Sequence, residues 1–176
     1  MDELDNEQFA VGHYLQSLLN APLASSPVVP REQLGRKLKL MQFRVGKLCC
    51  AVEHRYLAGI QPILEAPVPW PGEAPPWLAG YMEESAQQAK IIDLQALAQG
   101  TTAAPPEIQG SQRLIALLQG RFAIVADEVL GGINIYEKQV TWRGQNSQRP
   151  WLAGIYRADT GLVILDVPGL QELLPE

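Results

Sequence analysis

The tetrapeptide Trp-Leu-Ala-Gly occurs twice in this chain, at residues 77–80 and 151–154. Each copy follows a proline and leads, after a short gap, into an apolar run that ends in aspartate, Asp93 in the first copy and Asp166 in the second. A solenoid needs three or more short repeats to bury a continuous core. A long period that occurs twice therefore predicts two similar half-domains within one fold.

Two further matches lie upstream and keep the same offset of 73 or 74 residues. They pair Gly46-Lys47-Leu48 with Gly120-Arg121-Phe122, and Gly59-Ile60 with Gly132-Ile133. We expect the halves to superpose with Gly80 on Gly154 and with Asp93 on Asp166. Because the shared residues are mostly glycine, alanine, leucine and tryptophan, the repeat indicates a duplicated scaffold rather than a duplicated reaction centre.

Composition and charge limit the partners and the location. The 176 residues suffice for one compact domain or for two small halves that share a core. A net charge of -5 opposes nonspecific phosphate binding, so we expect no nucleic-acid partner, and the most basic stretch, residues 31–39, also contains Glu32. No apolar run reaches about 18 residues, and the N-terminus is acidic, so we expect a cytoplasmic protein without direct membrane insertion.

The motifs of common enzymes and metal sites are absent from the sequence. It has no Gly-x-x-x-x-Gly-Lys-Ser/Thr phosphate loop and no Gly-x-Ser-x-Gly nucleophile elbow. A metal site would need Cys49, Cys50, Glu53 and His54 to converge, a spacing that matches no standard zinc framework. Adjacent strand residues point to opposite faces, so the thiols predict no ordinary disulfide and suit a reducing compartment. We expect no catalytic residues, no metal and no cofactor.

Residues 1–36 differ from the rest of the chain. Apolar side chains within residues 6–20 fall on roughly one helical face, and residues 21–30 have the proline-rich composition of a linker. An amphipathic helix on a linker is a common way to dock onto a partner. The alternative is a tail that packs on its own domain or frays. We expect residues 1–36 to be dispensable for folding.

From residue 38 the apolar period changes to two, which predicts short β-strands. Many short strands with glycine and proline turns are typical of an all-β barrel or sandwich. Residues 62–76 contain six prolines and predict a stiff loop, and residues 100–110 predict a linker between halves at roughly 37–100 and 111–176. The expected elements are strands at 38–45 (with a bulge), 47–52, 55–60, 90–94, 113–118, 121–126, 133–136, 152–156 and 162–165, and a helix at 168–174.

Two residue types in the repeat look functional and have structural explanations. Asp93 and Asp166 end equivalent strands, where a local hydrogen bond to the backbone would turn the chain out of the strand. Trp77 and Trp151 are expected to cover the core. Trp70, which stands between two prolines, is the tryptophan that we expect to be exposed, as interface anchors often are.

Together these landmarks resemble the CheW family of bacterial chemosensory adaptors, over about residues 38–175. The first half has Phe43-x-Val45-Gly46, then Gly80 thirteen residues before Asp93-Leu94. The second half matches better, through Gly120, Asp127-x-Val129, residues 151–155, Leu165-Asp166-Val167, Leu170 and Leu173-Leu174.

The resemblance implies an all-β fold of two intertwined, five-stranded SH3-like barrels (CheW-like) with short helices, here with an N-terminal helical tail. It also implies a noncatalytic scaffold. Such a scaffold would join chemoreceptor cytoplasmic tips to a CheA-type histidine kinase, through apolar patches on the barrel ends and a groove between the barrels, at polar, membrane-associated arrays.

One segment departs from the family pattern. Members follow the position of Gly80 with Val-Ile-Asn-Leu-Arg-Gly, whereas residues 81–86 here are Tyr-Met-Glu-Glu-Ser-Ala. Lys90 stands where members have proline, and Ser85 stands where they have arginine. Loss of this cation beside Glu83 and Glu84 should repel a partner that is selected to meet arginine. The chain is therefore more similar to divergent relatives, such as ParP-type polar adaptors whose tail would dock a polar-localisation protein, or auxiliary coupling proteins of twitching motility.

Two classes of function stay open at this point. The first is the chemosensory scaffold, and the second is a small-ligand-binding or enzymatic β-domain whose proline- and tryptophan-rich 62–77 loop closes a pocket. The scarcity of polar groups that could converge on a substrate favours the scaffold. The predicted partner-binding residues are Leu57, Ile60, Trp70, Tyr81, Glu83, Glu84 and Ser85.

Overall fold

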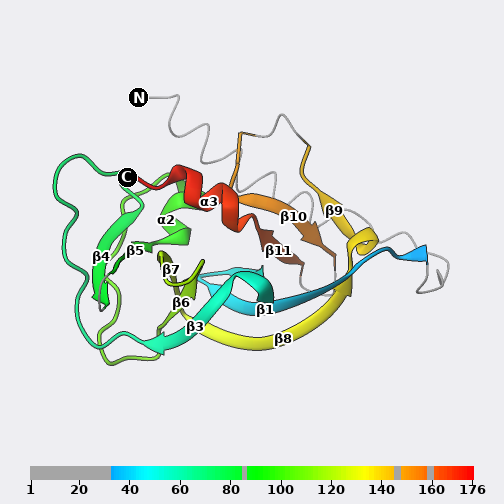
Figure 1. Cartoon of the computed structure of the whole chain (residues 1–176), viewed down its shortest axis with the longest axis horizontal. Coiled ribbons are helices and arrows are strands. Elements are labelled where there is room, and N and C mark those ends of the chain that lie inside the picture. The colour runs from blue at the N-terminus through cyan, green and yellow to red at the C-terminus, as the bar shows by residue number, and fades with distance from the viewer. Residues whose placement is uncertain (1–32, 85–86, 145–147, 158–160) are drawn as a thin grey trace.

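The computed structural model describes residues 33–84, 87–144, 148–157 and 161–176 (Figure 1). The tail helix and proline-rich linker expected before residue 33 lie outside these residues. The described strands form two sheets, in the orders β8-β1-β2-β11-β10-β9 and β3-β6-β7-β5-β4. Their bounds are β1 Lys37–Val45, β2 Leu48–Glu53, β3 Leu57–Pro62, β4 Leu78–Glu84, β5 Gln87–Ile92, β6 Arg113–Leu117, β7 Phe122–Ala126, β8 Glu128–Tyr136, β9 Val140–Trp142, β10 Leu152–Tyr156 and β11 Leu162–Leu165.

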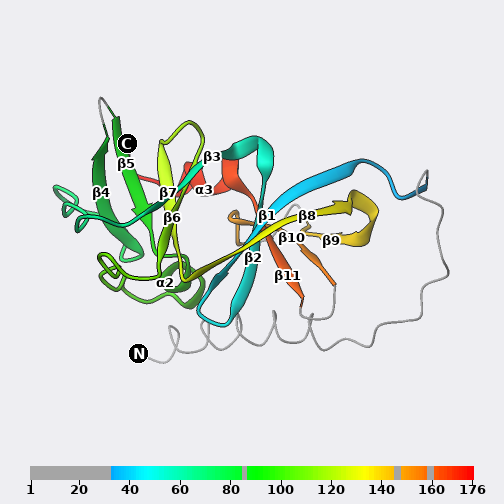
Figure 2. The ribbon, with the colours of Figure 1, turned by 90° about the horizontal axis from the view of Figure 1, so that it is seen from below.

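The two halves of the chain are intertwined, as the family resemblance implied. Strands β1 and β2 of the first half join β8 to β11 of the second half, and β6 and β7 of the second half join β3, β4 and β5 of the first. The parallel contacts β2–β11 and β5–β7 join strands of different halves. Figure 2 shows β1, β2 and β8 crossing near the middle of the molecule. Each half therefore supplies its first hairpin to the sheet of the other half.

The resemblance implied five strands in each half, but the first sheet has six strands and the second has five. The extra strand is β9, which pairs with β10 through Thr141 and Ile155. At the equivalent place in the first half, only a single bridge forms, between Val68 and Tyr81. Val68 lies between two prolines, which have no N–H to extend a ladder, so a second strand does not form there.

The repeat places its matching pairs at equivalent positions, as predicted, although Gly80 has a positive φ and Gly154 does not. Gly80 and Gly154 both follow a β-bulge and pair with Ile91 and Ile164, respectively. Asp93 N–H donates to the Trp77 carbonyl at 3.0 Å, and Asp166 N–H donates to the Trp151 carbonyl at 2.8 Å. Both aspartates then cap helices, through hydrogen bonds from Ala96 N–H and Gly169 N–H.

The upstream matches are out of register in the structure. Phe122 pairs with Leu117 and lies beside Lys90, whereas Cys50 pairs with Phe43 and lies beside Val163. Phe122 is therefore the counterpart of Cys50 rather than of Leu48, because the β1–β2 hairpin is longer than the β6–β7 hairpin.

A second upstream match is shifted by one residue. Ala58 and Leu130 are the bulged residues of β3 and β8, so Gly59 corresponds to Gly131 rather than to Gly132. The bulge that was predicted in β1 lies instead in its partner β8: Gln42 and Phe43 are consecutive, and the register shift between them comes from Leu130.

Two helices cover the ends of the sheets. The segment expected as a strand at 90–94 is strand β5, which ends at Ile92, followed by helix α2, Leu94–Gln99. The terminal helix α3, Val167–Leu173, agrees with the predicted one. Residues 55 and 56, expected at the start of a strand, belong instead to a short 3-10 turn, η2 His54–Tyr56. Beyond Pro62, which ends β3, and the Val68 bridge, the proline-rich loop and the 100–110 linker carry no strand or helix of the described set.

The main core cluster takes side chains from both sheets and both helices. Phe43 and Phe122 are fully buried at its centre, and Trp151 is 4% exposed. Trp77 packs against the same cluster and is half-buried, so both repeat tryptophans cover the core as expected. Because strands of both halves share this cluster, neither half has a separate core of its own.

Candidate partner-binding surface

An exposed apolar strip follows the outer edge of the five-stranded sheet. Side chains of β3 and the residues after it alternate, so Ile60 and Leu64 face outward while Ile63 is 1% exposed. Ile60 is 39% exposed and Leu64 is 62% exposed. Ile108, 48% exposed, is held alongside because Gln109 N–H donates to the Ile63 carbonyl at 2.9 Å. We call Ile60, Pro62, Leu64 and Ile108 the β3 strip.

A groove between the two sheets begins beside this strip. Its volume is about 570 Å³. Its lining comes from β1, β3, β6 and β8, from the β7–β8 junction and from the segment before β6, as Arg44, Ile60, Ser111, Arg113, Asp127, Glu128 and Val129. An ion pair of 3.0 Å joins Arg44 to Glu128 at its rim. Ile60 therefore belongs both to the strip and to the groove, which makes the two one continuous surface.

Asp127 makes one wall of this groove rigid. Its carboxylate accepts hydrogen bonds from Gly46 N–H at 2.6 Å and from Gln112 Nε2 at 2.9 Å. Its own N–H donates to the Arg44 carbonyl at 2.8 Å. Since these partners come from the β1–β2 turn and from the segment before β6, Asp127 joins the two halves at the groove.

The proline-rich loop packs on the other edge of the same sheet. The Trp70 ring meets the Tyr81 ring edge-on, with 6.0 Å between centroids, and Lys90 Nζ lies 5.4 Å from the Trp70 centroid. Lys90 Nζ also donates to the Pro175 carbonyl. Trp70 is half-buried by these contacts, so the expectation of an exposed Trp70 is wrong. Trp142 is the exposed tryptophan, at 48%.

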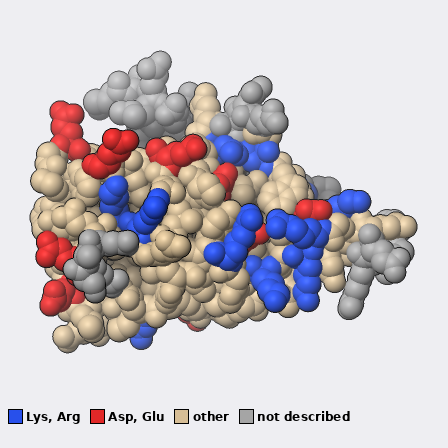
Figure 3. All heavy atoms as spheres, in the orientation of Figure 1, with Lys and Arg blue, Asp and Glu red and all other residues tan. Residues whose placement is uncertain are grey.

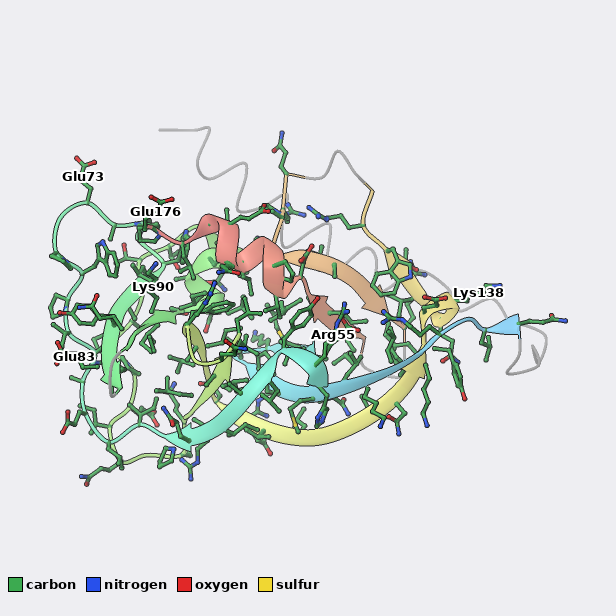
Figure 4. The ribbon with its side chains drawn as sticks, viewed as in Figure 1. Arg55, Glu73, Glu83, Lys90, Lys138 and Glu176 are labelled. Atoms are coloured by element: carbon green, nitrogen blue, oxygen red, sulfur yellow. The ribbon has the colours of Figure 1, made fainter. Side chains whose placement is uncertain are left out.

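The residues predicted to bind partners fall in two places rather than one. Leu57 and Ile60 lie on β3, and Leu57 is half-buried against the main core. Tyr81 and Glu83 lie on β4, the opposite edge strand of the sheet, and Figure 4 shows Glu83 near the outer end of that strand. Glu84 ends β4 in a backbone pair with Gln87, and Ser85 lies outside the described residues.

Two residues of the surface were missed in the sequence. The period-two pattern of β3 could have been extended to Leu64, but the prolines around it indicated a loop. Ile108 carried no local signal, because its position depends on a hydrogen bond between segments far apart in the chain.

Charge is unevenly distributed over the two sheets. Figure 3 shows lysine and arginine side chains gathered over the region of β1, η2 and β8, and most acidic side chains elsewhere on this face. Arg55, between α3 and β1 in Figure 4, and Lys138, at the far end of β8, belong to the basic region. Glu73 and Glu83 lie at the opposite end of the molecule, where β4 lies.

The basic region contains a second concavity, of about 340 Å³. We call it the arginine pocket, and its polar and aromatic lining consists of Arg36, Glu53, Arg55, Tyr56, Trp142, Arg143 and Asp166. Glu53 pairs with Arg55 at 2.9 Å and with Arg36 at 3.5 Å. Arg143 lies 3.6 Å from the Asp166 carboxylate, and the Arg55 guanidinium lies 4.6 Å from the Tyr56 centroid.

The cysteines form no disulfide in the structure. Cys50 is fully buried and Cys49 is half-buried, on opposite faces of β2. Burial, and in second place the neighbouring Cys49, raises the pKa of the Cys50 thiol far above its ordinary value. Within the described ranges, no three His, Cys, Asp or Glu side chains cluster as metal ligands would. No helix in those ranges is long and apolar enough to span a membrane.

Comparisons with known proteins agree with this architecture. The CheW-like domain family matches residues 39–173. Among solved structures, the chain is similar to the scaffolding protein TtCheW from Thermoanaerobacter tengcongensis, with a TM-score of 0.61 and 16% sequence identity over 75% of this chain and 90% of that one. No curated protein matches the sequence. The family match covers most of the chain, including both intertwined halves, and the chain therefore belongs to the CheW-like domain family.

Proposed function

We propose that this protein is a noncatalytic scaffold of a bacterial chemosensory array, which binds a CheA-type histidine kinase, chemoreceptor cytoplasmic tips, or both, in the cytoplasm. The observation that carries the proposal is the β3 strip, which continues into the groove between the sheets. Contiguous exposed apolar residues with a polar rim are typical of protein-binding surfaces. Membership of the CheW-like family and the fold shared with a scaffolding protein support the same function.

The acidic end of β4 would change which partner binds there. Glu83 is exposed, and Glu84 and Ser85 follow where the family pattern has leucine and arginine. This end lies on the opposite edge of the sheet from the β3 strip. The strip would therefore keep a general docking role, while the β4 end would select partners that tolerate negative charge.

The alternative, in which the 62–77 loop closes a ligand pocket, has less support. Trp70 packs on Tyr81 and Lys90 of its own sheet. The groove and the arginine pocket take no lining residue from that loop. The loop acts instead as a cover for the β4 edge, which would otherwise present unpaired backbone groups.

The test is titration calorimetry of the full chain against a kinase regulatory domain and, separately, against a receptor tip. We expect binding to at least one of them, and Leu64→Asp should weaken it by about tenfold or more, as loss of an interface anchor does. Leu130→Asp is the matched control, because Leu130 is an exposed leucine on β8, outside the strip. No binding to either partner, together with metabolite hits in a thermal-shift screen, would favour the alternative.

A further inference from the structure

A turn of the chain fills a specific site on the five-stranded sheet. Gly46, in the β1–β2 turn, donates its N–H to the Asp127 carboxylate. A Cβ added to Gly46 would lie 2.9 Å from Gln95 Oε1, so the turn is in close contact with the start of α2. The site between Asp127 and Gln95 is therefore plugged by this turn.

The repeat places the counterpart of this site in the arginine pocket. Because Phe122 corresponds to Cys50, and Val129 corresponds to Leu57, Asp127 corresponds to Arg55. The match of Asp93 with Asp166 likewise makes Pro168 the counterpart of Gln95. Arg55 and Pro168 both line the arginine pocket.

The turn that would plug this second site is too short. Six residues lie between the paired Phe43 and Cys50, but only four lie between the paired Leu117 and Phe122. A Cβ added to Gly120, in the shorter turn, would have no heavy atom within 4 Å. The arginine pocket is thus the open counterpart of a plugged site.

The chemistry of the open site is reversed. A carboxylate that accepts a backbone N–H in the plugged site is replaced by the Arg55 guanidinium, which donates. The pocket has three guanidiniums against two carboxylates, and the side chains of Arg36 and Arg55 are each 57% exposed. An occupant should therefore carry carboxylates that accept bidentate hydrogen bonds from arginine.

The chain itself contains such a segment outside the described residues. Residues 2–7 hold four carboxylates, on Asp2, Glu3, Asp5 and Glu7, and no basic side chain. The described chain begins at residue 33, close in sequence to Arg36 at the pocket rim. A coil with the length of residues 8–32 would span about 25–30 Å, and a short tether would give an effective concentration of about millimolar. We propose that the acidic segment of residues 2–7 docks in the arginine pocket of its own chain.

This inference concerns a site apart from the β3 strip and does not depend on the proposed function. The test uses the full chain with Leu4→Cys carrying a nitroxide label, in a Cys49→Ser background, while Cys50 stays fully buried. Paramagnetic broadening is measured on amide and indole NMR signals. Trp142 is a suitable reporter, because its indole Nε1 donates to the Glu137 carbonyl at 2.8 Å and the ring lines the pocket.

We expect broadening centred on Arg36, Arg55 and the Trp142 indole at low salt, and its loss at about 0.5 M salt, where the Debye length falls to about 4 Å. Replacing the four carboxylates (Asp2→Asn, Glu3→Gln, Asp5→Asn, Glu7→Gln) should reduce it at least fivefold and alters no described residue. Arg36→Glu with Arg55→Glu should reduce it as strongly. Lys37→Glu with Lys39→Glu, an equal charge change on exposed residues of β1 outside the pocket, should not.

Three results would overturn the proposal. The first is broadening spread evenly over the surface, and the second is broadening centred on Lys90 and Arg121, the cations at the other end of the molecule. The third is an effect of the Lys37 and Lys39 control equal to that of the arginine variants, since a general attraction to positive charge would then explain the data.

Discussion

Replacing Gly80 with alanine should destabilise the protein strongly. Gly80 has φ +126°, and an added Cβ would lie 2.2 Å from the Val68 carbonyl oxygen. Nonbonded heavy atoms prefer about 3.5 Å, so Val68 would have to retreat by about 1 Å. That movement would break the bridge in which Val68 and Tyr81 exchange hydrogen bonds of 2.8 and 2.9 Å.

The size of the effect follows from these losses. A non-glycine residue at positive φ costs about 1–2 kcal/mol, and each backbone hydrogen bond contributes about 1 kcal/mol. Alanine restricts the unfolded chain, which offsets about 0.4–1 kcal/mol. The net change in the free energy of unfolding is about 2–3 kcal/mol, or a fall in melting temperature of about 5–10 °C for a domain of this size.

The matched control is Gly59→Ala on β3 of the same sheet. Gly59 has no heavy atom within 4 Å of an added Cβ and no positive φ, so this variant should be neutral or slightly stabilising. Urea unfolding of both variants, followed by tryptophan fluorescence and circular dichroism, gives the comparison. A loss below about 1 kcal/mol for Gly80→Ala would show that the 62–76 loop moves freely away from β4, and would refute the close packing of the bridge.

Four further outcomes are expected. Asp93→Ala should lower the free energy of unfolding, measured in urea, by about 1–2.5 kcal/mol, because the carboxylate accepts hydrogen bonds from the N–H groups of Ala96 and Ala104. Asp93→Asn should lose less than half of that free energy. Because burial raises the Cys50 pKa, its contribution to stability is present below the unfolded pKa of about 8.5 and is lost as the pH rises above that value. The free energy of unfolding should fall there by up to about 1.4 kcal/mol per pH unit, and Cys50→Ala should remove this component of the stability–pH profile. Glu84→Leu with Ser85→Arg should raise affinity for a standard kinase–receptor surface by about 1–3 kcal/mol in a salt-sensitive way, and unchanged affinity at low salt would place partner choice elsewhere. Deleting residues 1–32 should leave the melting temperature nearly unchanged while weakening one partner interaction. The expectation that all of residues 1–36 are dispensable needs correction: deleting them should cost about 1–2 kcal/mol, because the Leu34 and Arg36 carbonyls accept N–H groups of Lys138 and Glu137.

Much of the fold was predictable because short-range signals agreed with the long-range repeat. Strands β10 and β11 have the bounds that the period-two pattern predicted, and the aspartates after β5 and β11 form the expected local hydrogen bonds. Helix α2 was missed because Leu94–Gln99 is short and its apolar residues continue directly from the buried strand β5. A buried strand followed by a buried helix shows no break in hydrophobicity, so periodicity alone does not separate them.

The candidate site was less predictable than the fold. Ile60, which was predicted to bind a partner, is exposed in the structure. The contacts of Trp70 with Tyr81 and Lys90 depend on how a proline-rich loop folds back over β4. Composition shows that such a loop is stiff, but it does not show where the loop lies. Ile108 joins Ile60 and Leu64 only because a linker crosses the end of β3, which is a long-range contact.

The two halves show how a duplicated scaffold acquires different surfaces from small changes in chain length. The β1–β2 hairpin is longer, and its turn reaches Asp127 at the junction of β7 and β8, while the shorter β6–β7 hairpin leaves the equivalent place open. The cores tolerate this difference because the paired strands behind the turns keep their register on β5 and β11. Residues that face the turns have no such constraint, and there Asp127 of the second half is the counterpart of Arg55 in the first half. Differences between the halves of this domain should therefore be sought first beside the hairpin turns, where a change of length or charge alters a surface without disturbing the shared core.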